Sequence, residues 1–168
     1  MSKIDKKIAE IKQKEQSAEN LNHLGDLYLE KGEKLTAVSY YYSAAASSSR
    51  DKAIAIYKKV LSILPSEVLA LQSLIDIYAS TGWIAKAVEY LLQLANHYRG
   101  RGEGQEEIKV YRRILELDPE NESAVNYFGR GKGLAAKISR MEETKVHKPL
   151  PPGPVEEAAR LSAAPSGE

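Results

Sequence analysis

An internal repeat constrains the fold of this chain more than any other feature. The segments AIAIYKKVLSILP (53–65) and EIKVYRRILELDP (107–119) place an isoleucine, a tyrosine, two basic residues and a leucine in the same order before a proline. The two prolines, Pro65 and Pro119, lie 54 residues apart. Repeats of about 20–50 residues are typical of arrays in which each unit buries its apolar face against the next. The chain is therefore predicted to fold as stacked copies of one unit.

Each copy is expected to consist of helices. The apolar residues recur every three or four positions, and no segment alternates apolar and polar residues as a half-buried strand does. Helices are expected over residues 2–16, 18–30, 34–47 and 51–64. The last of these ends before Pro65, because the residue preceding a proline disfavours the α-helical conformation. The predicted fold class is all-α.

The first helices of the unit return 50 residues later. The recurring residues are Leu21, Leu24, Tyr28, Gly32 and Ala37, which return as Leu71, Leu74, Tyr78, Gly82 and Ala87. A third unit opens after Pro119 and stops short. The expected organisation is an amphipathic N-terminal helix over 1–17 that packs on the array, a helical array over 18–142, and a flexible tail over 143–168. The tail is rich in Pro, Ala, Gly and Ser and has too few large apolar residues to offset the entropy of ordering.

The first copy carries a pattern known from a repeat family. Residues 18–51 read Leu21-x-x-Leu24-Gly25-x-x-Tyr28, followed by Ala37, Tyr41 and Ala44. The second copy, 68–101, keeps Leu71, Leu74, Tyr78, Ala87, Leu91 and Leu94, and has Ile75 where glycine is usual. This pattern resembles the tetratricopeptide repeat over about residues 18–130. The resemblance implies a right-handed α-solenoid of stacked antiparallel helices, and a scaffold that binds other proteins.

The units are longer than the repeat they resemble. A tetratricopeptide repeat has about 34 residues, whereas these units span 50 to 54 residues. The excess is close to one helix and a turn. Either the middle helix belongs to two overlapping repeats, or the chain uses a three-helix repeat with the same core residues. Both interpretations predict the same kind of solenoid.

The composition gives the chain no general affinity for polyanions. Its 168 residues include 24 Lys or Arg and 23 Asp or Glu, a net charge of +1, so neither nucleic acid nor a membrane is an expected partner. There is no cysteine, which excludes disulfides and thiolate metal sites. The first residues lack the apolar core of a secretory signal, and no apolar run approaches the roughly 18–20 residues of a membrane-spanning helix. A cytoplasmic location is expected.

No catalytic motif is present. The three histidines, His23, His97 and His147, fall in separate parts of the sequence. The segment GRGKG (129–133) lacks the spacing of a phosphate-binding loop, and no strand precedes it. We therefore expect no enzymatic activity, no cofactor and no metal.

The resemblance also implies a binding groove. In this family the first helix of each repeat lines a concave groove, and polar residues of these helices project into it. The candidates are Asn22 and Asp26, Gln72 and Asp76, and Asn126 and Arg130. The members of each pair are four residues apart and share one helical face. Amides pair with backbone N–H and C=O groups, and carboxylates select donors or positive charge. The expected ligand is a peptide or helical segment that is neutral or basic rather than acidic, and a merely hydrated groove is the alternative.

Two further functions stay open. The truncated third unit leaves a helix face without a cover, formed by Val125, Phe128, Leu134 and Ile138, so the first alternative is self-association into a homo-oligomer. The second alternative is RNA binding through Arg99, Arg101, Arg112 and Arg113. The paired basic residues at 58–59 and 112–113 are otherwise interpreted as a solvated helix face.

Overall fold

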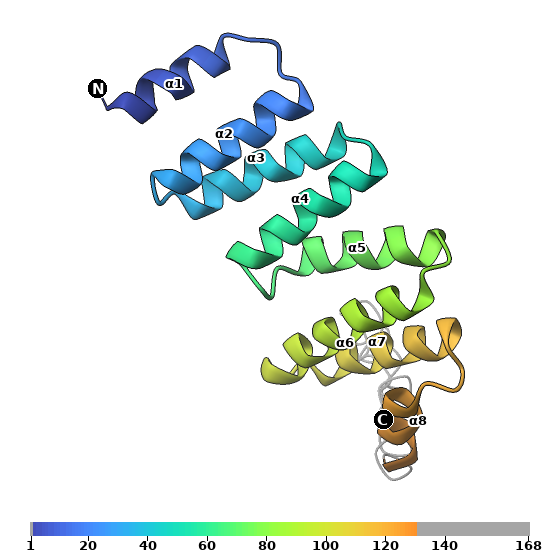
Figure 1. The fold of residues 1–168 in the computed structure, drawn as a ribbon. Coiled ribbons are helices and arrows are strands. Elements are labelled where there is room, and N and C mark those ends of the chain that lie inside the picture. The colour runs from blue at the N-terminus through green and yellow to red at the C-terminus, as the bar shows by residue number, and fades with distance from the viewer. Residues whose placement is uncertain (1, 131–168) are drawn as a thin grey trace, which may run out of the picture. The chain divides into compact units, whose positions relative to one another are not determined.

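The computed structural model describes residues 2–130. Within these residues the chain forms eight helices and no strand (Figure 1). The helices are α1 (Lys3–Lys12), α2 (Ala18–Glu30), α3 (Lys34–Ala46), α4 (Arg50–Ile63), α5 (Val68–Ser80), α6 (Ile84–Gly100), α7 (Gly104–Leu117) and α8 (Glu122–Arg130). The all-α prediction is confirmed for the described residues. The predicted tail, 143–168, lies outside them.

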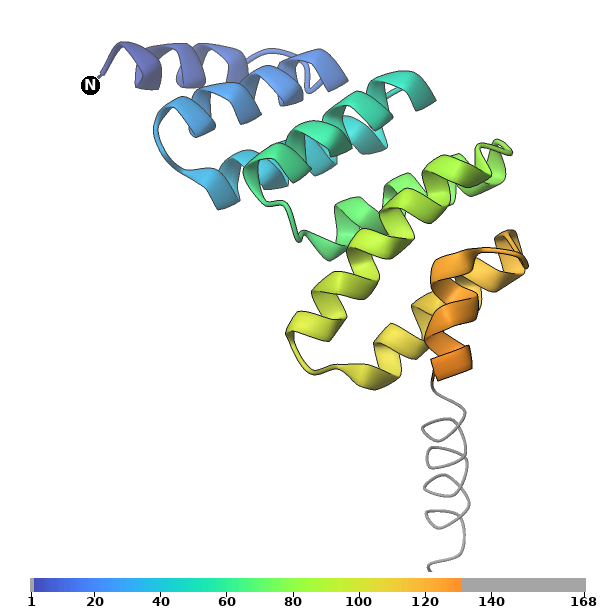
Figure 2. The same cartoon turned by 60° about the horizontal axis from the view of Figure 1, so that its bottom comes forward.

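The chain divides into two units, Met1–Val125 and Asn126–Glu168. In the first unit each helix packs on the helix before it and the helix after it, from α1 on α2 through α6 on α7. Figures 1 and 2 show successive helices of this unit running in opposite directions. The connections between them have only three to five residues, and so short a loop returns the chain along the helix it has just left.

Three glycines end helices by taking a left-handed conformation. Gly32, Gly82 and Gly102 have φ values of 81°, 77° and 71°. In each case the N–H of the next residue donates across the last turn to a tyrosine carbonyl at 2.9 Å, in the pairs Glu33–Tyr28, Trp83–Tyr78 and Glu103–Tyr98. Glycine is favoured here because a positive φ strains a residue that has a Cβ. The first of these stops agrees with the helix that the sequence predicts over residues 18–30.

Prolines set two other helix ends. Leu64 and Asp118 directly precede Pro65 and Pro119, and they have φ values of −130° and −142°. Both have left the helical conformation, as expected for a residue before proline. The end of α4, predicted at residue 64, is therefore correct to within one residue, and α7 ends in the same way before Pro119.

The N-terminal helix is shorter than predicted. The sequence predicts a helix over residues 2–16, whereas α1 ends at Lys12. Ile8 and Ile11 are buried against two leucines of α2, and residues 13–16 are all polar and add nothing to this apolar stripe. The helix stops where its buried side stops.

The sequence repeat reappears in the packing of two tyrosine pairs. Tyr28 of α2 stacks on Tyr40 of α3, with ring centroids 5.2 Å apart and an interplanar angle of 8°. Tyr78 of α5 stacks on Tyr90 of α6, with centroids 5.8 Å apart and an angle of 5°. The second pair lies 50 residues after the first. The helix pairs α2–α3 and α5–α6 therefore share their internal contacts as well as their sequence pattern.

Candidate functional site

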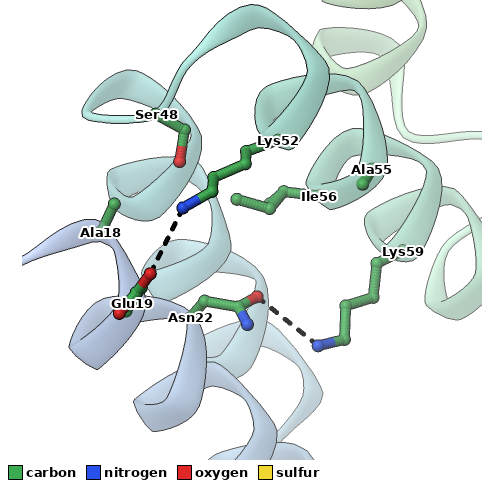
Figure 3. Close-up of a pocket in the computed structure, with 8 residues that line it drawn as sticks. All are labelled: Ala18, Glu19, Asn22, Ser48, Lys52, Ala55, Ile56 and Lys59. Atoms are coloured by element: carbon green, nitrogen blue, oxygen red, sulfur yellow. Dashed lines mark hydrogen bonds and ion pairs between the residues drawn. The ribbon is translucent and has the colours of Figure 1, made fainter.

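A hollow of about 320 Å³ lies between α2 and α4, and we call it the N-terminal hollow (Figure 3). Its lining consists of Ala18, Glu19 and Asn22 of α2, Ser48 of the α3–α4 connection, and Lys52, Ala55, Ile56 and Lys59 of α4. Figure 3 shows the Ile56 side chain extending between the two helices, with the charged groups around it. The hollow therefore combines an aliphatic interior with a polar rim.

Two lysines of α4 reach across this hollow to α2. Lys52 Nζ lies 3.3 Å from Glu19 Oε1. Lys59 Nζ donates to Asn22 Oδ1 at 3.5 Å and forms an ion pair with Asp26. Exposed pairs of this kind contribute only about 0–1 kcal/mol each to stability. The two positive and two negative charges therefore cancel around the hollow.

Asp26 is held by a buried tyrosine as well as by Lys59. The Tyr41 hydroxyl donates to Asp26 Oδ1 at 2.6 Å, and Tyr41 is fully buried. Lys59 Nζ lies 4.7 Å from the centroid of the same ring, a distance at which a cation is attracted to the ring face. Burial raises the pKa of Tyr41, and the hydrogen bond to Asp26 raises it further. Three side chains from three helices thus meet at one edge of the hollow.

A second hollow, the C-terminal hollow, lies between α5 and α7 and measures about 150 Å³. Its lining consists of Gln72 of α5, Leu91, Leu94 and Tyr98 of α6, and Glu106, Lys109, Val110 and Arg113 of α7. Arg113 Nη2 donates to Asp76 Oδ1 at 2.6 Å. Lys109 Nζ donates to Glu106 Oε1 at 2.6 Å. This rim also pairs its positive groups with carboxylates.

The two hollows are counterparts in the sequence repeat. Six lining residues of the N-terminal hollow have a lining counterpart 50 or 54 positions later. The counterparts are Asn22 and Gln72, Ser48 and Tyr98, Lys52 and Glu106, Ala55 and Lys109, Ile56 and Val110, and Lys59 and Arg113. The ion pairs correspond in the same way, since Asp26–Lys59 returns as Asp76–Arg113. One surface feature therefore occurs twice in the first unit.

The structure distributes four of the predicted groove residues over these two hollows. Asn22 and Asp26 border the N-terminal hollow, and Gln72 and Asp76 border the C-terminal hollow. The two linings have no residue in common. Each predicted pair is thus brought together, but the two pairs lie in separate hollows.

The remaining predicted residues lie on α8 or beyond it. Asn126 is exposed, and the side chain of Arg130 lies outside the part of the chain that the structure describes. Of the predicted self-association face, Val125 is 48% exposed and Phe128 is half-buried. Leu134 and Ile138 lie outside the described residues.

The cations that pair with Asp26 and Asp76 were not among the predicted site residues. Lys59 and Arg113 were interpreted as part of a solvated helix face, whereas each reaches a carboxylate on another helix. The signal that could have found them is the recurrence of complementary charge, because an aspartate and a basic residue return together in the second copy. The contacts themselves depend on how α4 and α7 pack, which the sequence does not display.

The arginines considered for RNA binding are largely engaged within the chain. Arg99 Nε donates to Glu107 Oε1 at 2.7 Å, and its Nη2 donates to the Tyr111 hydroxyl at 2.9 Å. Arg101 Nε donates to Glu103 Oε1 at 2.5 Å, and Arg113 is paired with Asp76 as described above. Three of the four arginines are thus neutralised by neighbouring carboxylates.

Within residues 2–130, no cluster of three or more His, Cys, Asp or Glu side chains is arranged to hold a metal ion. None of the helices described in that range is both long and apolar enough to cross a membrane. No protein-family model matches this chain, and no curated protein matches it.

Proposed function

We propose that this chain is a non-catalytic protein–protein interaction module, folded as a right-handed α-solenoid of the tetratricopeptide-repeat type. The residue pattern that resembles this family supports the proposal, and so does the packing of each helix on its neighbours in the chain. We further propose that the module acts in the cytoplasm, which agrees with a sequence that has no cysteine. Its role is to hold partners within a larger assembly.

One observation carries this proposal: a hollow lined at corresponding positions occurs in both copies of the repeat. Each hollow offers an aliphatic residue, an amide and a carboxylate–cation pair. An aliphatic interior gives binding energy through burial of apolar surface, and the amide and the charges fix orientation. The partner is a peptide or helical segment of another protein, neutral or basic rather than acidic, because both acidic groups Asp26 and Asp76 border the hollows.

The test is to fill the hollows and measure partner binding. Ala55 of α4 and Lys109 of α7 are exposed lining residues at equivalent positions. A partner captured from a cell lysate by the immobilised full chain is identified by mass spectrometry and then titrated in purified form. The double variant Ala55→Trp/Lys109→Trp is expected to bind at least about tenfold more weakly, a difference of about 1.4 kcal/mol.

The matched control is Ala85→Trp. Ala85 is exposed in the first turn of α6 and lines neither hollow. Circular dichroism of all variants establishes that the helices are intact. Equal affinity of the double variant and the control would contradict binding in the hollows.

Self-association is the second candidate, and one exposed residue favours it. Val125 of α8 is 48% exposed, whereas Leu71, its counterpart 54 residues earlier, is fully buried. A residue that is covered in one copy and uncovered in another indicates a face that a second molecule can cover. Light scattering on the full chain measures the molar mass in solution, which is expected to be lower for the Val125→Glu variant than for the parent protein. A strictly monomeric parent protein at high concentration would exclude it.

A further inference from the structure

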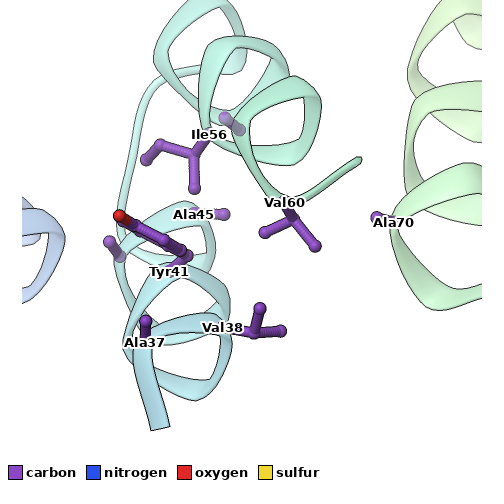
Figure 4. Packing of buried hydrophobic residues seen from close by; sticks show 9 residues of the cluster. Ala37, Val38, Tyr41, Ala45, Ile56, Val60 and Ala70 are labelled. Carbon is purple, nitrogen blue, oxygen red and sulfur yellow. The ribbon is translucent and has the colours of Figure 1, made fainter. Parts of the chain in front are cut away.

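One fully buried residue shows how the helices of the first unit are layered. Val60 of α4 belongs to the same core cluster as Val38 of α3 and Ala70 of α5, and Figure 4 shows the three side chains facing a common space. The helices α3 and α5 therefore both lie on the buried side of α4. It follows that α3 and α5 form one layer and that α4 belongs to the other.

Ion pairs between helices that are not consecutive in the chain identify neighbours within a layer. Lys52 of α4 reaches Glu19 of α2, so α2 lies beside α4. Arg113 of α7 reaches Asp76 of α5, so α7 lies beside α5. The remaining helix, α6, packs on both α5 and α7 and therefore lies in the layer of α2 and α4. The helices α2 to α7 alternate between two layers.

This alternation puts the two hollows on opposite faces of the first unit. The N-terminal hollow lies between α2 and α4, which belong to one layer. The C-terminal hollow lies between α5 and α7 of the other layer, with three residues of α6 in its lining. The cause is the odd number of helices in the repeat, because a shift by three helices changes the layer. It also reverses the direction, as α2 and α5 run oppositely in Figure 1.

We propose that the first unit is bivalent: its two hollows bind two copies of the same kind of extended, uncharged peptide segment, one on each face. The chain thereby bridges two partner molecules that run in opposite directions. This inference rests on the proposed function, since it requires that the hollows bind protein segments. It goes beyond that function in the number, the placement and the chemistry of the ligands.

The groups that the hollows share define the ligand. Both present a β-branched aliphatic residue, Ile56 or Val110, which suits an aliphatic side chain of the ligand. Both present an amide, Asn22 or Gln72, which pairs with free backbone N–H and C=O groups. The middle of a helix has no such free groups, because its backbone is bonded internally, so the ligand is extended.

Among the neutral or basic segments of the proposed function, charge complementarity favours the uncharged ones. Each hollow has one cation that is the counterpart of a cation in the other, Lys59 or Arg113, and each of these is already paired with an aspartate, Asp26 or Asp76. A ligand carboxylate would compete with that aspartate, and a ligand cation would compete with the lysine or arginine. A carbonyl group adds a hydrogen bond to the cation without displacing either partner. The hollows differ in volume, about 320 and 150 Å³, so the two affinities are expected to differ.

The experiment measures how many peptides bind. Short peptides are selected on the full-length chain from a random phage-displayed library, and the best one is titrated by isothermal calorimetry. We expect two peptides per wild-type chain, one for Ala55→Trp, one for Lys109→Trp and none for the double variant. The control Ala85→Trp is expected to bind two.

A second measurement tests the opposite faces. The selected peptide is fused to a bulky fluorescent protein, and the mass of the complex is measured by light scattering. Hollows on opposite faces accommodate two fusion proteins at once, so the expected complex contains one chain and two fusions. If two free peptides bind but only one fusion protein does, the two hollows do not lie on opposite faces.

The outcomes separate this inference from the proposed function. One peptide per wild-type chain, lost in only one of the two single tryptophan variants, overturns bivalence and leaves the proposed function standing. A selected peptide that binds all variants equally overturns both, and so does a selection that yields no binding peptide. The selected peptide could carry a net charge and lose its affinity when the charged residues are replaced by neutral ones. That result would overturn the proposed ligand chemistry.

Discussion

A methyl group added at Gly25 should destabilise the protein, because the ring of Tyr41 occupies the space beside its backbone. A Cβ at Gly25 would lie 2.5 Å from Tyr41 Cε1 and 2.7 Å from Cδ1, closer than real Cβ contacts come. The ring has little freedom to move away, since it is fully buried and its hydroxyl is bonded to Asp26. Gly25→Ala must therefore displace Tyr41 or separate α2 from α3.

The expected size follows from opposing terms. Alanine is favoured over glycine inside a helix by about 1 kcal/mol. Overpacking a filled interior costs about 1–3 kcal/mol, and a displaced Tyr41 also weakens a hydrogen bond to a carboxylate worth about 1.5–3 kcal/mol. We expect Gly25→Ala to lower the free energy of unfolding by about 1.5–5 kcal/mol net.

Urea unfolding followed by far-UV circular dichroism measures this loss. The control is Gly100→Ala, where an added Cβ meets nothing within 4 Å, so stability should stay unchanged or rise slightly. The second copy suggests a rescue, because Ile75 and Leu91 stand where the first has Gly25 and Tyr41. Gly25→Ala/Tyr41→Leu should lose less than the sum of its single variants. A Gly25→Ala protein as stable as the parent would refute the close approach of ring and backbone.

Three further predictions concern other contacts. Arg99→Ala removes the guanidinium that donates a hydrogen bond to the nearly buried Glu107 carboxylate. We expect urea unfolding to show a free energy of unfolding lower by about 1–3 kcal/mol. Tyr42→Phe removes a buried hydroxyl that makes no well-aligned hydrogen bond within residues 2–130, although Glu67 and the Ala70 backbone lie near it, so stability in the same assay should be unchanged or raised. The pKa of Asp5 is held at about 2, below its usual 3.8, chiefly by hydrogen bonds from Ser2. This stabilisation is present above the usual pKa and is lost as the pH falls towards 2, and Ser2→Ala should return the pKa towards 3.8 in an NMR titration.

Each of these has a counterpart that should behave differently. Arg101→Ala breaks the exposed ion pair with Glu103 and should lower the free energy of unfolding by only about 0–1 kcal/mol. A loss as large as that of Arg99→Ala would show that the burial of Glu107 does not strengthen its ion pair. Tyr41→Phe removes a hydroxyl bonded to Asp26 and should be the more harmful tyrosine variant. An Asp5 carboxyl that titrates at its ordinary pH in the parent protein would show that the N-terminal capping contacts do not form.

Helix ends were the most predictable part of the fold, because their causes are local. Pro65 and Pro119 end α4 and α7, and Gly32 ends the α2 segment with a positive φ. Each of these helix ends is set by one or two residues and does not depend on contacts with the rest of the chain. The predicted end of α1 is wrong because the prediction included residues 13–16, which are all polar and add nothing to the side of α1 that α2 buries.

The candidate site could be predicted only in part. The sequence places Asn22 and Asp26 on one helical face, and both border the same hollow. It did not reveal that Lys59 lies opposite them, since that depends on the packing of α4 on α3. Nor did it indicate that the second copy, with Asp76 and Arg113, belongs to another layer. The helical period predicts which residues share one face of a helix. Which helices lie side by side depends instead on how many helices each repeat contains.

The two copies differ in how firmly they hold the acidic residue of the hollow. Tyr41 donates to Asp26, whereas Leu91, its counterpart, has no hydroxyl to offer Asp76. The Asp76 side chain is 65% exposed, against 47% for Asp26. The exposed Asp76–Arg113 pair contributes only about 0–1 kcal/mol, so Arg113 can shift to meet a ligand carbonyl while it stays near Asp76, whereas the lysine of the N-terminal hollow is held by a carboxylate that the buried tyrosine orients. Under the proposed function, the N-terminal hollow is thus the pre-organised copy and is expected to discriminate more strongly among ligands, and the cation Arg113 of the C-terminal hollow is expected to adapt to the ligand.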